Sequence, residues 1–130
     1  MNRSLRIVAL ISIIGLLLAC NDGMTESQHL TKSREFKDKG QFNAASIELK
    51  NALQKSPDNP EARLELGKLY LEMGDMAAAE KELSRAADLG AKPDIIMPFL
   101  GRSLLYQGKH ADVMDLSLKG LNDEAKAEIL

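Results

Sequence analysis

The sequence has few of the residues on which catalytic and cofactor sites depend. Its 130 residues include one cysteine, two histidines and no tryptophan, and only 4% are aromatic. His29 and His110 lie far apart in the chain, and neither has a cysteine or carboxylate at the spacing of a metal site. The single cysteine excludes an internal disulfide. We therefore expect no metal, cofactor or disulfide in this protein.

The sequence also lacks a Gly-rich loop of the kind that binds phosphate groups. Glu80, Glu82, Asp112 and Asp115 fall on predicted helices, and we interpret them as solvated surface charges rather than as catalytic carboxylates. With no nucleophile, base or metal site in view, the sequence does not support an enzyme or a small-molecule substrate.

No apolar run is long enough for a transmembrane helix, which needs about 20 residues. Residues 7–18 form an apolar run of 12 residues that follows Arg3 and Arg6. A short apolar run behind basic residues is typical of a secretory signal. A short buried helix is a poor alternative, because the run is apolar on all sides and lies at the terminus.

The run ends in the letters LLAC at residues 17–20, which resemble a bacterial lipobox. The resemblance implies that residues 1–19 are a signal peptide, that Cys20 is lipidated, and that residues 20–25 form a lipidated cysteine and short linker. A plain signal with an incidental cysteine is the alternative. The lipid would hold the protein on a membrane, and two or more acyl chains anchor stably.

Loss of the signal would remove two arginines, so the formal charge would fall from −2 to −4. A moderately acidic surface is a poor match for nucleic acid. Asn21 follows the cysteine where lipoproteins keep their sorting information. Because Asp at that position favours retention in the inner membrane, we weakly favour the outer membrane.

The residue pattern at 60–93 predicts two helices that pack antiparallel to each other. Leu66, Leu69 and Tyr70 recur at the three- and four-residue steps of one helix face. Gly74 ends the first predicted helix. Gly67 and Ala79 are small, and we expect the two helices to cross closely at these residues.

This stretch resembles a tetratricopeptide repeat, a helix–turn–helix unit of about 34 residues. The same spacing divides the chain into a first repeat at 26–59, a second at 60–93, a divergent third at 94–121, and the first helix of an incomplete fourth at 122–130. The resemblance implies an all-α fold of stacked repeats, an α-solenoid. The repeat-signature positions hold Phe36, Gly40, Ala45, Leu49, Ala52, Pro57, Leu66, Gly67, Tyr70, Gly74, Ala79, Leu83, Ala86, Gly101 and Gly108.

Pro98 is unusual for the first helix of the third repeat. A proline inside a helix removes one hydrogen bond and costs about 3 kcal/mol. We therefore expect the regular helix of that repeat to begin close to Pro98.

One basic residue recurs at the same position of each repeat, as Arg34, Lys68 and Arg102. The resemblance implies that this position lines a concave groove, where the three cations would bind an acidic peptide or a carboxylate terminus. Ordinary exposed helix cations are the alternative. The apolar residues expected beside them are Leu30, Leu64, Leu71, Leu105 and Tyr106.

Residues 70–90 and 100–116, together with the lipobox, resemble the N-terminal part of the TPR-repeat lipoproteins of PEP-CTERM (exosortase) systems. That resemblance implies a Gram-negative cell envelope, a periplasmic orientation, and an adaptor that binds protein or peptide partners during exopolysaccharide or PEP-CTERM protein export. The alternative is a structural scaffold subunit of a cell-envelope or outer-membrane assembly.

The lipid anchor gives a direct test. Cys20→Ser should release the protein from the membrane or leave it unprocessed, because the thiol that receives the lipid is gone. Intact-mass measurement of the wild-type protein should show loss of residues 1–19 and a gain of lipid mass. An unmodified Cys20 in membrane-derived protein would refute the anchor.

Overall fold

The computed structural model describes residues 23–120, and these residues form six α-helices and no strand. The helices are α2 (Glu26–Asp38), α3 (Phe42–Lys55), α4 (Pro60–Met73), α5 (Met76–Asp88), α6 (Pro93–Tyr106) and α7 (His110–Gly120). The predicted all-helical fold is confirmed.

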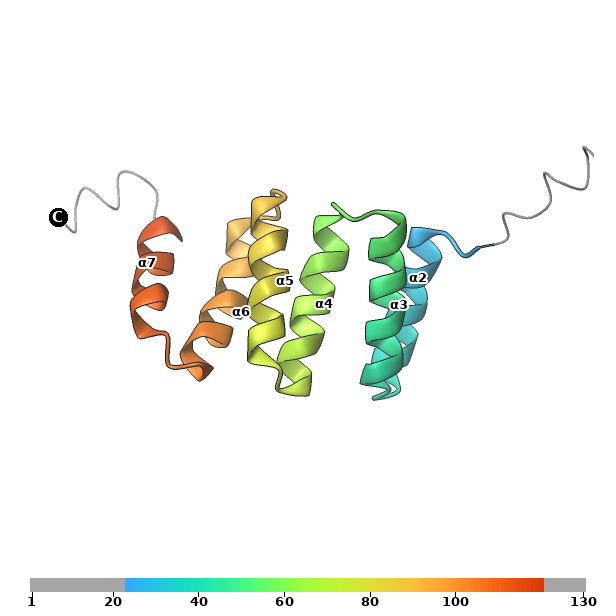
Figure 1. Cartoon of the computed structure of the whole chain (residues 1–130), viewed down its shortest axis with the longest axis horizontal. Coiled ribbons are helices and arrows are strands. Elements are labelled where there is room, and N and C mark those ends of the chain that lie inside the picture. The colour runs from blue at the N-terminus through green and yellow to red at the C-terminus, as the bar shows by residue number, and fades with distance from the viewer. Residues whose placement is uncertain (1–22, 121–130) are drawn as a thin grey trace, which may run out of the picture.

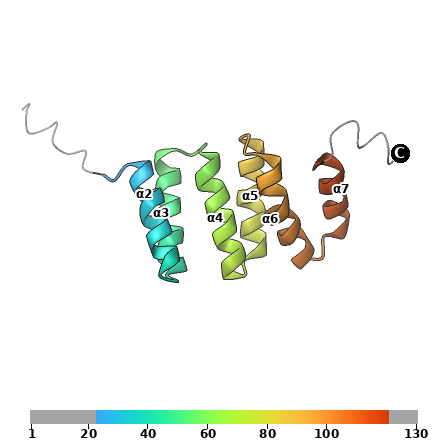
Figure 2. The ribbon, with the colours of Figure 1, turned by 180° about the vertical axis from the view of Figure 1, so that it is seen from behind.

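The helices form three antiparallel pairs that follow one another along the long axis of the molecule (Figure 1). The pairs are α2 with α3, α4 with α5, and α6 with α7, and α4 and α6 connect each pair to the one before. In Figure 1, α3 and α5 lie nearer the viewer than α2 and α6, and Figure 2 shows the reverse. The first helices of the outer pairs therefore lie on the opposite face from α3 and α5.

Side chains at the helix starts explain where the chain becomes helical. Thr25 and Gln28 form a capping box at the start of α2, in which each side chain bonds the backbone N–H of the other residue. The backbone N–H of Ala62 donates to the side-chain oxygen of Asn59 at 3.0 Å at the start of α4. Gly74 ends α4 with a φ of 80°, a left-handed conformation that suits glycine.

The buried residues form two apolar clusters. The first lies between α2, α3 and α4 and includes Leu49, Ala52 and Leu66. The second joins α5 to α6 and includes Leu83 and Ile96, which are both fully buried. Each helix pair therefore buries part of its apolar surface on its neighbour, as in other stacked repeats.

The tightest approach lies between α4 and α5 at Gly67. A Cβ atom built on Gly67 would lie 2.6 Å from Cγ of Leu83 and 3.3 Å from the carbonyl oxygen of Ala79. Leu83 and Ala79 are both fully buried, so neither can move aside freely. Glycine is therefore required for these two helices to pack at this distance.

The expectation that the third repeat's helix begins near Pro98 is wrong. Helix α6 begins at Pro93 and continues through Pro98 to Tyr106. Pro98 lies in the second turn and is exposed, so water can reach the carbonyl of Asp94 that loses its helical partner. The opposite side of the same turn buries Ile96 completely, and this burial offsets the cost of the proline.

No helix within residues 23–120 combines the length and the apolar content needed to cross a bilayer.

The close approach at Gly67 predicts that a glycine-to-alanine substitution affects stability differently at Gly67 and at Gly101, the equivalent position of the third repeat. Gly67→Ala should destabilise the protein by about 1–3 kcal/mol, because the added methyl group overpacks the crossing. At Gly101 the nearest atom to a built Cβ is Cδ2 of Leu116, at 3.7 Å. Gly101→Ala should therefore leave stability unchanged or raise it by up to about 1 kcal/mol, since alanine favours a helix. Urea unfolding of both variants measures this, and equal effects would contradict the close crossing.

Candidate functional site

The candidate site is the surface formed by the exposed side chains of α2, α4 and α6, which we call the first-helix face. Its repeated cations are Arg34 on α2, Lys68 on α4 and Arg102 on α6. Their surroundings differ, and the differences decide what each cation can bind.

Arg34 is already engaged by a carboxylate. Its guanidinium lies 2.6 Å from a carboxylate oxygen of Glu61, in the first turn of α4. Lys37 makes a second ion pair, at 3.1 Å, with Glu72 near the end of α4. The two ion pairs connect α2 to α4 near both ends of α4. Where α2, α3 and α4 meet, a cavity of only about 10 Å³ is left, which holds at most about one water.

Lys68 is also engaged. Its ammonium group lies 2.7 Å from a carboxylate oxygen of Glu65, one turn earlier on α4. The same ammonium group lies 5.5 Å from the centre of the Phe99 ring on α6, a cation–π distance. Lys68 therefore connects the second repeat to the third.

Arg102 differs from both. Its guanidinium lies 5.9 Å from the centre of the Tyr106 ring, one turn later on α6. Within the part of the chain that the structure describes, no carboxylate forms an ion pair with Arg102. Arg102 is therefore the cation of this set that is ready to pair with a carboxylate from outside.

The apolar residues expected beside the cations are not all at the surface. Leu71 is 3% exposed, and Leu30 is 8% exposed, because each is buried in one of the two apolar clusters. Leu64 is partly buried against the second cluster. Leu30 and Leu71 therefore do not offer the apolar surface expected beside the cations, whereas Leu105 and Tyr106 are 51% and 70% exposed.

Two predictions from the sequence concern residues outside the described range. They are the lipidated Cys20 with its signal peptide, and the first helix of a fourth repeat at 122–130.

The expectation of solvated surface carboxylates is wrong for Glu82, whereas Asp112 is exposed and Glu80 is partly exposed but paired. Glu82 is 9% exposed and accepts a hydrogen bond from the Arg63 guanidinium at 2.7 Å. Glu80 accepts hydrogen bonds from the Lys109 ammonium at 2.6 Å and from the Gln107 amide at 2.7 Å. These bonds, that of Lys109 first, lower the pKa of Glu80 below its ordinary value. Glu82 thus joins α5 to α4, and Glu80 joins α5 to the loop that follows α6.

A buried polar cluster was missed because its members are separated in the sequence. The His29 ring nitrogen Nδ1 lies 2.6 Å from one carboxylate oxygen of Glu48, and the Lys32 ammonium lies 2.9 Å from the other. His29 and Glu48 are 9% and 7% exposed. The hydrogen bonds from Lys32 and then His29 lower the pKa of Glu48, although its burial opposes them. The only sequence signal for this cluster is the repeat spacing, which predicts that the helices carrying His29 and Glu48 pack against each other.

Among the described residues, no group of three or more His, Cys, Asp or Glu side chains is placed to hold a metal ion. The arrangement offers ion pairs and exposed apolar side chains, which suit binding of another chain.

A comparison with protein-family models found one match. Residues 37–96 match the family model described as tetratricopeptide repeat. The matched stretch is therefore similar to tetratricopeptide repeats. Tetratricopeptide repeats are typically interaction modules rather than enzymes. No curated protein matches the chain by sequence.

Solved structures share the same fold at low sequence identity. The first TPR of Spaghetti (RPAP3), bound to the HSP90 peptide SRMEEVD, matches with a TM-score of 0.68 at 18% identity, over 79% of this chain and 86% of its own. The second TPR of Spaghetti, bound to the same peptide, has a TM-score of 0.67 at 15% identity, over 73% and 88%. The globular C-terminal domain of P. aeruginosa LpoP has a TM-score of 0.65 at 22% identity, over 73% and 93%.

The buried cluster predicts a specific loss of stability in acid. Because the folded state lowers the pKa of Glu48 below its ordinary value, the Lys32 ion pair and the hydrogen bonds to Glu48 contribute stability above that ordinary pKa. This contribution is lost as the pH falls through the lowered pKa. Glu48→Gln should therefore destabilise the protein at neutral pH, and the difference from wild type should shrink in acid.

Urea unfolding at a series of pH values measures this difference. Glu35→Gln is the matched control, because Glu35 is an exposed carboxylate on the neighbouring helix α2. A Glu48→Gln effect that stays constant down to about pH 3 would contradict the lowered pKa.

Proposed function

We propose that this tetratricopeptide-repeat protein is a membrane-anchored adaptor in the periplasm, which binds a protein or peptide partner on its first-helix face. The observation that carries the proposal is Arg102, an exposed cation beside exposed apolar residues on α6 with no carboxylate paired to it among the described residues. An exposed cation next to apolar surface favours binding of a chain that supplies a negative charge and apolar side chains.

The solved neighbours support binding of a peptide. Two of them are described as bound to the HSP90 peptide SRMEEVD. The identity is too low to transfer that ligand, so the partner's chemistry must come from this chain's own residues.

The sequence supports the anchor. The apolar run and the letters LLAC at residues 17–20 favour a lipid on Cys20. The N-cap of α2 is Thr25, so about five residues separate the lipid from the first helix. An extended chain covers at most about 3.3–3.6 Å per residue, which places α2 within roughly 20 Å of the membrane. We favour the outer membrane over the inner one because Asn21, and not Asp, follows the cysteine.

We further propose that the adaptor acts in exopolysaccharide or PEP-CTERM protein export. This part rests on the resemblance of residues 70–90 and 100–116 alone, and none of the comparisons links the chain to such a system.

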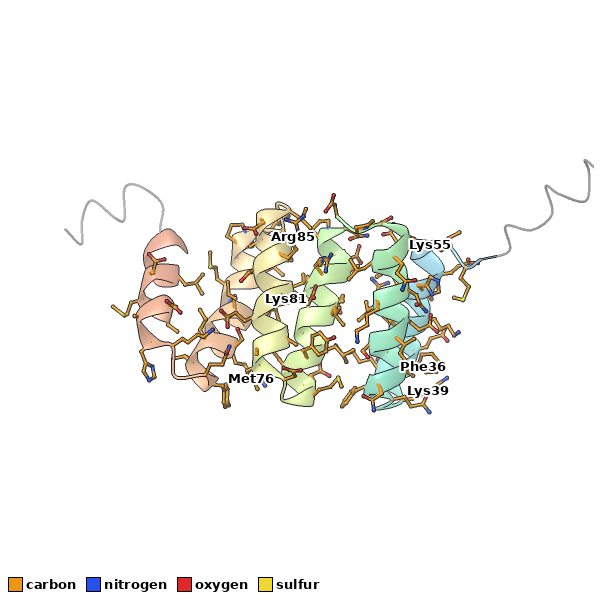
Figure 3. All side chains as sticks on the ribbon, in the orientation of Figure 1. Phe36, Lys39, Lys55, Met76, Lys81 and Arg85 are labelled. Atoms are coloured by element: carbon orange, nitrogen blue, oxygen red, sulfur yellow. The ribbon has the colours of Figure 1, made fainter. Side chains whose placement is uncertain are left out.

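Charge reversal tests where the partner binds. Substitution of Arg34, Lys68 and Arg102 by Glu should abolish capture of the partner when the full chain is crosslinked and recovered from membranes. The matched control reverses the exposed Lys39, Lys81 and Lys92, which changes the net charge equally. Figure 3 shows Lys81 on α5, away from the first-helix face.

The control variant should retain the partner. If both variants retain it, the first-helix face is not the binding site, and the alternative of a structural scaffold that uses other surfaces gains support. Thermal unfolding of both variants must show that they still fold.

A further inference from the structure

Four residues of α6 form one continuous stripe on the first-helix face. Ile95, Phe99, Arg102 and Tyr106 are spaced by four, three and four residues, which places them on one side of the helix. Ile95 is 44% exposed and Tyr106 is 70% exposed, and Phe99 is partly buried between them. We call these four residues the α6 stripe, and α6 lies toward the viewer in Figure 2.

The equivalent positions of the other two repeats have a different character. On α2 they are polar: Ser27, Thr31, Arg34 and Asp38. On α4 they are mostly acidic: Glu61, Glu65, Lys68 and Glu72. Each of the three α4 carboxylates is paired with a cation, at 2.6, 2.7 and 3.1 Å. The α2 stripe is therefore polar, the α4 stripe is mostly acidic with each carboxylate paired, and the α6 stripe is apolar with one cation.

The sequence explains why Arg102 has no carboxylate partner among the residues that the structure describes. Lys68 finds its carboxylate three residues earlier, but three residues before Arg102 stands Phe99. Arg34 finds its carboxylate 27 residues later, but that offset from Arg102 falls on Ile129. Neither offset that serves the other two cations carries an acid for Arg102.

We propose that the α6 stripe binds a partner segment that is apolar and carries one carboxylate. The carboxylate pairs with Arg102, and bulky apolar side chains cover Ile95 and Tyr106. This inference rests on the proposed function and names the partner's chemistry. Aromatic and arginine side chains are the residue types that most often dominate binding energy at interfaces.

The charge balance of the face disfavours a strongly acidic partner. Its cations Arg34, Lys37 and Lys68 are each paired with an acid of α4, and further exposed acids, Glu35 and Asp94, lie on α2 and α6. A polyacidic tail therefore gains no net attraction, and it must displace ion pairs that already join α2 to α4. One carboxylate placed on Arg102 meets no such competition from residues 23–120.

Three synthetic peptides test this chemistry against the purified full chain by fluorescence anisotropy. The first is the end-capped peptide Ser-Leu-Leu-Asp-Leu-Leu-Ser, the second replaces its Asp by Asn, and the third is the acidic peptide SRMEEVD. The Asp peptide should bind up to about fivefold more tightly than the Asn peptide, the range of one exposed ion pair. It should also bind more tightly than SRMEEVD.

Two variants assign the contacts. Arg102→Gln should remove the preference for Asp over Asn. The double variant Ile95→Ser with Tyr106→Ser should weaken both Leu-rich peptides by about tenfold or more, because two apolar contacts are lost. All three side chains are exposed, so these variants should fold. The controls are Ile47→Ser, which removes a side chain 57% exposed on α3, and Lys81→Gln on α5, and neither should change binding.

Other outcomes would overturn the inference. A tighter complex with SRMEEVD, or equal loss from Ile47→Ser, would show that the α6 stripe does not select the partner. If the double variant converts a dimer to a monomer in sedimentation, the stripe binds a second copy of this chain instead. If the triple charge reversal abolishes capture of the natural partner while these α6 variants do not, the proposed function survives and this inference fails.

Discussion

The close approach of α4 and α5 at Gly67 is the constraint on which the central repeat depends. With Leu83 packed directly over the glycine, the two helices bury Ala79 and Leu83 completely. The first repeat has Ser33 at the equivalent position, and its hydroxyl donates to the carbonyl of Leu30 at 2.7 Å. The buried hydroxyl of Ser33 is thus hydrogen-bonded within α2, so a small polar residue can take the place of glycine in the first repeat. The tight pairs then stack, and the stacking gives α2, α4 and α6 a common face.

The interior of the array is repeated, whereas its surface is not. Most buried positions hold Leu, Ile, Ala or Ser, and the buried charged or titratable residues are His29, Glu48 and Glu82. The exposed stripes change from polar on α2 to acidic on α4 and apolar on α6. Because helix packing does not constrain exposed positions, these differences are free to serve binding. The ion pairs from Arg34 and Lys37 engage carboxylates of the α4 stripe and hold α2 against α4, whereas Ile95, Arg102 and Tyr106 of the α6 stripe stay exposed.

The sequence predicted the fold because the spacing of Leu, Gly and Ala residues reports directly on helix packing. It did not predict that Arg34 and Lys68 are paired, because their carboxylates come from an adjacent helix or an adjacent turn. The cluster of His29 and Glu48 was missed for the same reason. Pro98 was misjudged because a local cost was weighed without the burial of Ile96 that offsets it. Periodicity thus predicts which residues are buried, but pairing between exposed charges requires three-dimensional positions.

The central claim is that the first-helix face, and α6 in particular, contacts the partner. Methyl NMR of isoleucine-labelled protein tests it most directly, because Ile95 lies on that face, Ile47 lies on α3 and Ile96 is fully buried. During titration with the Asp-containing peptide, the account predicts a shift of the Ile95 δ1 methyl signal and no shift of the Ile47 signal. A shift of Ile47 with Ile95 unchanged would contradict the account.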